Sequence, residues 1–175
     1  EKFKRTWPAS CQLIGKDILT THAVYWSTML MALGLDLPEC IFAHGWWVTG
    51  EGKMSKSVGN IINPRDLVAR YGLDPFRFYL FREMVFGMDA TYTEENFILR
   101  YNADLANDYG NLCQRTLPML IKNREGVFRK KAATLVQSKE IVELAGQVKA
   151  GYIDAMENFL FHDALKHIWS LIQRL

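Results

Sequence analysis

The sequence predicts an α/β amino-terminal part, a small connector and an all-helical carboxy-terminal part. Before residue 60, two apolar runs that suit strands flank a stretch with a helical pattern, which indicates a strand, helix and parallel strand. After residue 96, only the helical period is found. With 49% hydrophobic residues in 175, the chain has enough apolar area to bury a core.

The first expected elements form one βαβ unit. Residues 11–14 predict a short buried strand that ends at Gly15. Asp17 then stands where an N-cap opens a helix that runs to about Leu33, with Gly34 in the C′ position. Residues 40–49 form a second apolar run, rich in β-forming side chains, and complete a parallel pair of strands.

A connector over residues 61–95 is predicted from two helix starts. Asn63-Pro64 gives an N-cap followed by proline at the first helical position, and Gly72 ends that helix. Asp74-Pro75 repeats the same device before a strongly aromatic segment. Residues 87–92 are rich in turn formers and predict a break. The connector is thus expected to be a small α/β or all-helical piece.

The remaining part, residues 96–175, is predicted to be a helical bundle. Thr93 caps a long helix whose apolar period continues to about residue 120, with Pro118 near its end. A basic linker over residues 122–131 follows, and two further helices then carry apolar stripes. Trp169 lies on the last stripe, which predicts a role in core packing.

Charge and cysteine content exclude several broad classes of protein. The net charge of +2 gives no general sign of a nucleic-acid binder, so any RNA contact must be local. Cys11, Cys40 and Cys113 show no metal-ligand spacing, and we expect isolated thiols in a reducing compartment, with no metal site. No apolar run reaches the roughly 18 to 20 residues of a membrane span.

A glycine-bracketed loop over residues 52–59 carries the strongest chemical signal. It places Lys53 and Lys56 three residues apart between glycines, so that two ammonium groups and nearby backbone N–H groups can approach a phosphate. A solvated surface loop with unrelated lysines is the alternative for this composition.

Residues 53–57 read Lys-Met-Ser-Lys-Ser, and this string resembles the signature of class I aminoacyl-tRNA synthetases. The resemblance implies that residues 1–60 are the second half of a Rossmann-type domain whose loop closes over ATP and its Mg²⁺. Lys56 would stabilise the transition state of amino-acid activation, with Lys53 assisting. Met54 is expected to pack the loop down.

The string Leu-Ile-Gly-Lys-Asp-Ile at residues 13–18 resembles the methionyl members of that class. Gly15 permits close approach of a nucleotide, and the Asp17 carboxylate can accept from ribose hydroxyls, with a plain helix cap as the alternative. Ile18 and His22 lie four residues apart, and the resemblance places methionine recognition there. A satisfied core histidine is the alternative for His22.

Residues 42–47 resemble the strand and turn that meet adenine in the same family. By that resemblance, the side chain of His44 and the backbone of Trp47 would contact ATP. The alternative for Trp47 is an ordinary buried strand residue.

Residues 102–112 resemble the start of the methionyl anticodon-binding bundle. Asn107, Asn111 and Arg115 are spaced by four and share one helix face, where amides and a guanidinium can read the bases of a splayed loop. The alternative is a polar helix face whose amides bond across the bundle.

The resemblance implies a ligase that joins methionine to tRNA(Met) through a methionyl-adenylate formed from ATP, in the cytoplasm or an organelle. Two alternatives stay open: a tRNA anticodon-binding module without catalysis, and another class I aminoacyl-tRNA synthetase. The family's upstream His-Ile-Gly-His signature and zinc knuckle are not found in this chain. We therefore expect the chain alone to be inactive and to bind no zinc.

Overall fold

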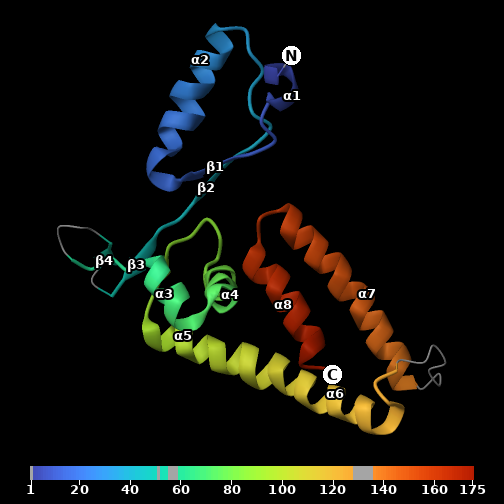
Figure 1. Cartoon of the computed structure of the whole chain (residues 1–175). Coiled ribbons are helices and arrows are strands. Elements are labelled where there is room, and N and C mark those ends of the chain that lie inside the picture. The colour runs from blue at the N-terminus through green and yellow to red at the C-terminus, as the bar shows by residue number, and fades with distance from the viewer. Residues whose placement is uncertain (1, 51, 55–58, 128–135) are drawn as a thin grey trace.

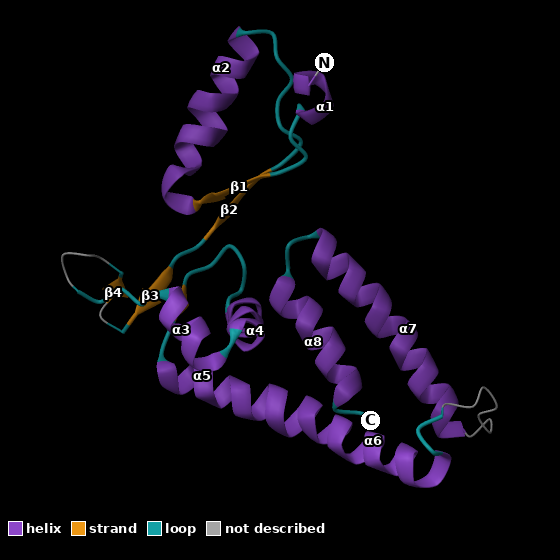
Figure 2. Cartoon of the chain, in the orientation of Figure 1, coloured by secondary structure: helices purple, strands orange, loops and turns teal. Residues whose placement is uncertain are grey.

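The computed structural model describes residues 2–50, 52–54, 59–127 and 136–175 (Figure 1). These residues are mostly helical and include two small sheets, each of which contains a parallel pair of strands (Figure 2). Helices α1 and α2 and strands β1 and β2 form one lobe, and the long helix and the α7–α8 hairpin lie at the other end of the molecule (Figure 1).

The expected βαβ unit is confirmed. After α1 (Lys2–Thr6), strand β1 (Gln12–Gly15) pairs in parallel with β2 (Ile41–His44). The helical segment between them ends in α2 (Ser27–Ala32). Gly34 has a φ of 66° and lies at the end of this segment, where Leu35 N–H donates to Leu30 O at 2.9 Å, which confirms the C′ position.

The start of that helical segment differs from the sequence prediction. A 3-10 turn (Lys16–Ile18) and a π-helix (Thr21–Trp26) precede α2, and the residue that caps the 3-10 turn is Gly15. Asp17 therefore lies inside the first turn, and its prediction as the N-cap is wrong. The chain turns into the helix directly at the glycine, two residues earlier than a cap at Asp17 requires.

The second sheet has the order β4-β3-β5. Strand β3 (Trp47–Thr49) pairs antiparallel with β4 (Gly52–Lys53) and parallel with β5 (Ala90–Thr91). The single strand expected over residues 40–49 is thus divided between two sheets, and the expected turn-rich break over residues 87–92 contains a strand. The two residues of β5 are too few to leave a periodic pattern in the sequence, and the apolar run continues through Trp46 between β2 and β3, so it does not show the division.

The connector contains α3 (Pro64–Tyr71) and α4 (Leu73–Glu83). Asn63 Oδ1 accepts from Arg65 N–H at 3.1 Å, which confirms this residue as the cap of α3. Helix α4 instead begins after Gly72 and has no side-chain cap. The prediction that Asp74 caps this helix, as Asn63 caps α3, is therefore wrong. Tyr79 and Phe76 of α4 pack into the core of this part, whereas Phe78 packs on Trp169 of α8 and Phe81 is 40% exposed.

That core is aromatic. Tyr79 of α4 and Phe97 are each 1% exposed, and Tyr92 joins them. Partly buried side chains from the second sheet and both connector helices pack around the three rings: Trp47, Met54, Ile62, Leu67, Tyr71, Phe76 and Leu80. Residues of the second sheet and the connector therefore share one core.

The long helix runs without interruption from residue 94 to residue 124. It consists of α5 (Glu94–Arg100), a π-helix (Tyr101–Gly110) and α6 (Asn111–Arg124). Thr93 Oγ1 accepts from Asn96 N–H at 3.1 Å and confirms the predicted cap. Pro118 lies inside α6, so its prediction near the helix end is wrong: proline removes one N–H donor, but the helix continues six residues beyond it.

Two further helices, α7 (Val136–Glu157) and α8 (Phe161–Ile172), form a hairpin, and α8 also packs on α4 (Figure 1). Trp169 is 7% exposed and lies 4.8 Å, between ring centroids, from Phe78 of α4, which confirms its core role. Residues 128–135, which include part of the predicted basic linker, lie outside the described residues.

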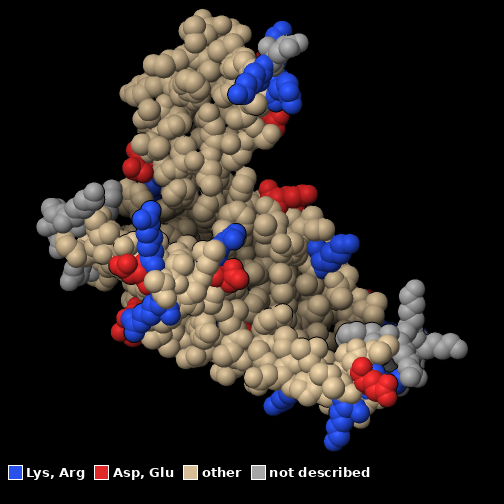
Figure 3. Space-filling view, in the orientation of Figure 1, with Lys and Arg blue, Asp and Glu red and all other residues tan. Residues whose placement is uncertain are grey.

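Ion pairs fasten α4 to the long helix. Arg82 Nε lies 3.1 Å from Asp104 Oδ2, with side chains only 14% and 8% exposed. Arg100 Nε lies 2.8 Å from Glu83 Oε2, and its Nη1 lies 3.8 Å from the same Asp104. On the face in Figure 3, basic and acidic side chains are scattered in small groups, in keeping with the small net charge.

The expectation of isolated cysteines is wrong for one pair. Cys11 and Cys40 directly precede the paired residues Gln12 and Ile41, so the parallel register places them side by side. Burial and the hydrogen bond with Cys40 raise the pKa of the Cys11 thiol, which favours its protonated form.

Within the described part of the chain, no helix is long and apolar enough to cross a membrane.

Candidate functional site

Three of the residues singled out in the sequence meet at the carboxyl ends of β1 and β2. Gly15 and His44 are register partners in this parallel pair, and Asp17 follows in the first helical turn. The Asp17 carboxylate folds back over Gly15, because a Cβ at position 15 would lie 2.6 Å from Asp17 Oδ1. A larger residue here would have to displace the Asp17 carboxylate. The edge thus presents a carboxylate where open α/β sheets bind ligands.

His44 and Trp47 contribute to this edge in different ways. His44 Nδ1 lies 2.8 Å from Gly45 O, and the ring stacks on Phe86 with centroids 5.8 Å apart. The Trp47 ring instead packs on Tyr79 in the core, 5.7 Å between centroids. At Trp47, therefore, only the backbone can serve a ligand at this edge.

A second feature of this lobe is a pocket of about 350 Å³ that contains His22. Its walls are Gln12, Thr21, His22, Tyr25, Trp26 and Met29. Among the described residues, buried Gln12 Oε1 and Trp26 Nε1 have no hydrogen-bond partner, so this mostly apolar pocket retains polar capacity. Ile18 does not line it and is 41% exposed, although its carbonyl oxygen lies 3.0 Å from His22 Nδ1.

The lysine loop is described only in part. Lys53 belongs to β4, and Lys56 lies outside the described residues. The structure therefore does not give the relative positions of these two predicted catalytic ammonium groups. Met54 is described, and it packs against the aromatic core and lines an apolar pocket of about 230 Å³ with Trp47 and Tyr92. The loop is therefore anchored on the core at Met54, as expected.

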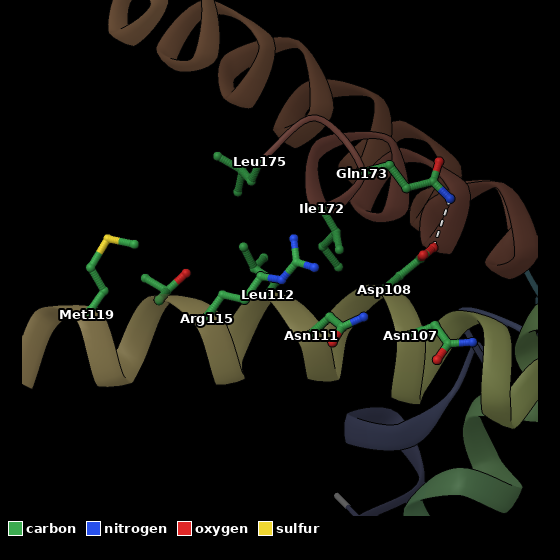
Figure 4. Close-up of a pocket in the computed structure, with 10 residues that line it drawn as sticks. Asn107, Asp108, Asn111, Leu112, Arg115, Met119, Ile172, Gln173 and Leu175 are labelled. Atoms are coloured by element: carbon green, nitrogen blue, oxygen red, sulfur yellow. Dashed lines mark hydrogen bonds between the residues drawn. The ribbon is translucent and has the colours of Figure 1, made fainter.

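The helical part holds a separate polar cavity of about 410 Å³ between the long helix and the end of α8 (Figure 4). It gathers Asn107, Asn111 and Arg115, the three residues predicted to share a face. Figure 4 also shows Asp108 facing Gln173, whose Nε2 donates to Asp108 Oδ2 at 2.8 Å. The cavity thus offers amide, guanidinium and carboxylate groups together, beside the apolar Ile172 and Leu175.

Sequence reasoning missed Asp89. Its carboxylate lies 2.7 Å from Lys16 Nζ and 2.8 Å from Trp46 N, next to Asp17 and the β2–β3 junction. No local signal marks it, because Asp89 lies in a turn-rich segment more than 70 residues after Lys16. Within the described residues, no group of three or more His, Cys, Asp or Glu side chains is arranged to hold a metal ion.

Comparison with known proteins decides the family. The family model for tRNA synthetases class I (M) matches residues 1–117, two thirds of the chain and all of the first sheet, the loop and the connector. The chain belongs to the class I (M) tRNA synthetases. The matched segment includes the loop over residues 53–57 and the edge formed by Gly15, Asp17 and His44.

Curated relatives agree with this class I (M) assignment. The chain is 46% identical over 175 residues to a methionine–tRNA ligase of Bacillus subtilis and 44% identical over 174 residues to one of Caldanaerobacter subterraneus. Each alignment covers 99% of this chain but only 26% and 27% of the relative, respectively. The chain therefore spans about a quarter of the length of these relatives.

Solved structures, like the curated relatives, match this synthetase chain beyond residue 117. Mycobacterium tuberculosis methionyl-tRNA synthetase bound by methionyl-adenylate has a TM-score of 0.93 at 40% identity, over 99% of this chain and 34% of that one. The apo form of the same enzyme has a TM-score of 0.89 at 36% identity. The helical part is thus included in the structural match.

Proposed function

We propose that this chain is part of a ligase that attaches methionine to tRNA(Met) through a methionyl-adenylate formed from ATP. The observation that carries the proposal is the TM-score of 0.93 to a synthetase bound by methionyl-adenylate, over 99% of the chain. In the reaction, the methionine carboxylate attacks the α-phosphate of ATP and releases pyrophosphate. The methionyl group then moves to a hydroxyl of the terminal ribose of the tRNA, and AMP leaves.

ATP is proposed to bind at the carboxyl ends of β1 and β2. Gly15 leaves room for the nucleoside, the Asp17 carboxylate accepts from ribose hydroxyls, and His44 with the Trp47 backbone borders adenine. The ammonium groups of Lys56 and Lys53 would neutralise charge that develops on the phosphates, which arrive with Mg²⁺. The exposed carboxylate of Asp17 supports this assignment, because it lies beside the backbone of Gly15.

Methionine is proposed to bind in the pocket that contains His22. The aromatic and thioether lining suits an unbranched apolar side chain with a sulfur atom, which makes favourable contacts with aromatic rings. Ile18 lies outside this pocket, but its carbonyl oxygen is 3.0 Å from His22 Nδ1, and it is proposed to border the methionine backbone. We propose that the ligase acts in the cytoplasm, where protein synthesis uses its product, with an organelle that carries out translation as the alternative.

The chain is proposed to divide into the second half of a Rossmann-type domain (residues 1–60), a stem-contact connector (61–95) and an anticodon-binding bundle (96–175). The core that Trp47 and Met54 share with α3 and α4 joins the first two parts. In the third part, Asn107, Asn111 and Arg115 are proposed to read anticodon bases, because bases can enter the polar cavity that they line.

Methionine-dependent exchange of pyrophosphate into ATP tests the proposal. It should be measured with a full-length ligase that carries this chain, meaning the chain joined to the other segments that its relatives have. Methionine should support exchange, whereas leucine and cysteine at equal concentration should not. Exchange with leucine or cysteine, and not with methionine, would assign the chain to another class I enzyme.

A second candidate function is tRNA binding without catalysis, and the polar cavity of about 410 Å³ favours it for the chain by itself. Binding of an anticodon stem-loop with the methionine anticodon should weaken about 5- to 160-fold on Asn111→Ala, since a base contact contributes about 1–3 kcal/mol. Gln114→Ala, on the same helix but not lining the cavity, is the matched control. Equal affinity for a stem-loop with a changed anticodon would exclude base reading.

A further inference from the structure

Asp89 joins three segments that surround the proposed nucleotide site. It follows the turn after α4 and directly precedes β5, opposite the junction of β2 and β3. The register partners Trp47 and Ala90 place Asp89 beside Trp46, and Ala90 N–H donates to Trp46 O at 2.9 Å. Trp46 N–H donates in turn to Asp89 Oδ1 at 2.8 Å, so the carboxylate extends the ladder by one bond.

The close approach of the Met88–Asp89 backbone to the β2–β3 junction requires glycine at position 45. A Cβ there would lie 2.1 Å from Met88 O and 2.7 Å from Asp89 N, which are backbone atoms that cannot turn away. The segment that carries Asp89 therefore lies directly on the junction between the two sheets. Its carboxylate is placed by main-chain packing, and not by a side chain that happens to reach across the surface.

Lys16 is the second partner of Asp89. Its ammonium group lies 2.7 Å from both carboxylate oxygens and 4.3 Å from the centre of the Trp46 ring. Lys16 immediately precedes Asp17, and the Trp46 ring also reaches Asp17, with Nε1 3.5 Å from Oδ1. One ring thus has the lysine over its face and the ribose-binding carboxylate at its edge.

The Lys16–Asp89 pair is too exposed to be explained by stability. The two side chains are 38% and 41% exposed, and ion pairs with this exposure contribute little to folding. Hydrogen bonds from Lys16 and from Trp46 N–H lower the pKa of Asp89, which keeps the group ionised at neutral pH. The pair therefore holds one negative and one positive charge in fixed positions next to Asp17.

We propose that Asp89 is a positioning residue of the nucleotide site, which keeps the Lys16 ammonium away from Asp17 so that this carboxylate stays free for the ribose of ATP. The proposal rests on the ligase function proposed above. Without the negative charge at position 89, the Lys16 side chain can turn towards the neighbouring Asp17 carboxylate and form an ion pair with it. It would then compete with the ribose hydroxyls for the same oxygens.

The test is a double-mutant cycle in the full-length ligase that carries this chain, read by methionine-dependent pyrophosphate exchange. Asp89→Asn keeps an oxygen that accepts from Trp46 N–H but releases Lys16, so KM for ATP should rise about tenfold while KM for methionine stays within about twofold. Lys16→Met removes the cation and should leave KM for ATP within about threefold of the wild type. The double variant should resemble Lys16→Met.

Each other outcome overturns the proposal. An unchanged KM for ATP in Asp89→Asn would show that the carboxylate does not position the site. A double variant that is as impaired as Asp89→Asn would show that a released lysine is not the cause. Glu143→Gln, an exposed acid on α7, controls for loss of a surface charge. If the wild type itself shows no methionine-dependent exchange, the proposed function fails instead.

Discussion

Single residues in this chain are constrained most where backbone or polar atoms meet without room to adjust. Gly45 is one such point, because the backbone of residues 88 and 89 passes against its Cα. His162 is another: it is 7% exposed, its Nε2 lies 3.1 Å from Asp163 Oδ1, and its Nδ1 has no partner among the described residues. Each gives a prediction that involves a single side chain.

Gly45→Ala should destabilise the chain, whereas Gly50→Ala should not. The added methyl group at position 45 would overlap Met88 O at 2.1 Å, and relief requires a backbone shift that costs about 1–3 kcal/mol. Nothing lies within 4 Å of a Cβ at Gly50, which makes it a matched control. The free energy of unfolding in urea measures both effects. Equal values for the two variants would contradict this close approach.

Stability should fall as the pH is lowered through the titration range of His162. Desolvation by burial lowers the pKa of His162 in the folded protein, so below about 6.5 the unfolded chain binds a proton that the folded chain does not. The contribution is complete above that value and is lost as the pH falls towards the lowered pKa. His162→Gln should reduce the change in the urea unfolding midpoint between pH 7.5 and pH 5.5. A variant that keeps the full pH dependence of the wild type would contradict this prediction.

Elements of this fold differ in how visible they are in the sequence. Asn63-Pro64, Thr93 and Gly34 carry their own capping chemistry, and the helix ends that they predicted are confirmed. The parallel β1–β2 pair was also predictable, because apolar runs flank a helical pattern. Strand β5 was not, since its pairing with β3 depends on contacts between residues over 40 positions apart.

The sites follow the same division. Local strings led to Gly15, Asp17 and His44 and to the cavity with Asn107, Asn111 and Arg115, and the structure brings each set together. Asp89 and Gln173 were missed because each meets its partner through tertiary packing alone. Sequence reasoning therefore finds groups carried on one turn or strand end, and it overlooks groups delivered from a distant segment.

The buried Arg82–Asp104 pair between α4 and the long helix gives the prediction at this scale. Asp104→Asn should cost about 3–5 kcal/mol, because it leaves the Arg82 guanidinium buried without a carboxylate. Arg82→Met with Asp104→Leu should cost less than that single change, since no charge is then left unpaired. Urea unfolding measures both. Lys166→Met removes an exposed pair with Asp163 and should cost at most about 1 kcal/mol. A double variant less stable than Asp104→Asn would contradict this account.

The whole molecule exposes more surface than a compact protein of its mass. Its accessible surface is 12926 Å², whereas a folded monomer of 20.2 kDa is expected to expose roughly 8,800 Å². Much of the apolar excess lies on the α2 lobe, where Val24, Tyr25, Met29, Met31 and Leu33 are each more than half exposed. This surface accords with a chain that spans about a quarter of the length of its relatives.

The two proposed sites lie far apart along this extended molecule. One is the edge of β1 and β2 in one lobe, and the other is the polar cavity between the long helix and α8 at the other end (Figures 1 and 4). The Arg82–Asp104 pair and the shared aromatic core connect the parts that carry them. This separation fits the proposed ligase, in which the edge would activate the amino acid and the cavity would read the anticodon of the tRNA.

Aminoacylation measures that combined claim most directly. The full-length ligase that carries this chain should transfer radiolabelled methionine to tRNA(Met) in an ATP-dependent reaction. A changed anticodon should lower kcat/KM by at least about fivefold, as the loss of one base contact implies. Transfer of another amino acid, or methionine transfer that is indifferent to the anticodon, would contradict the account.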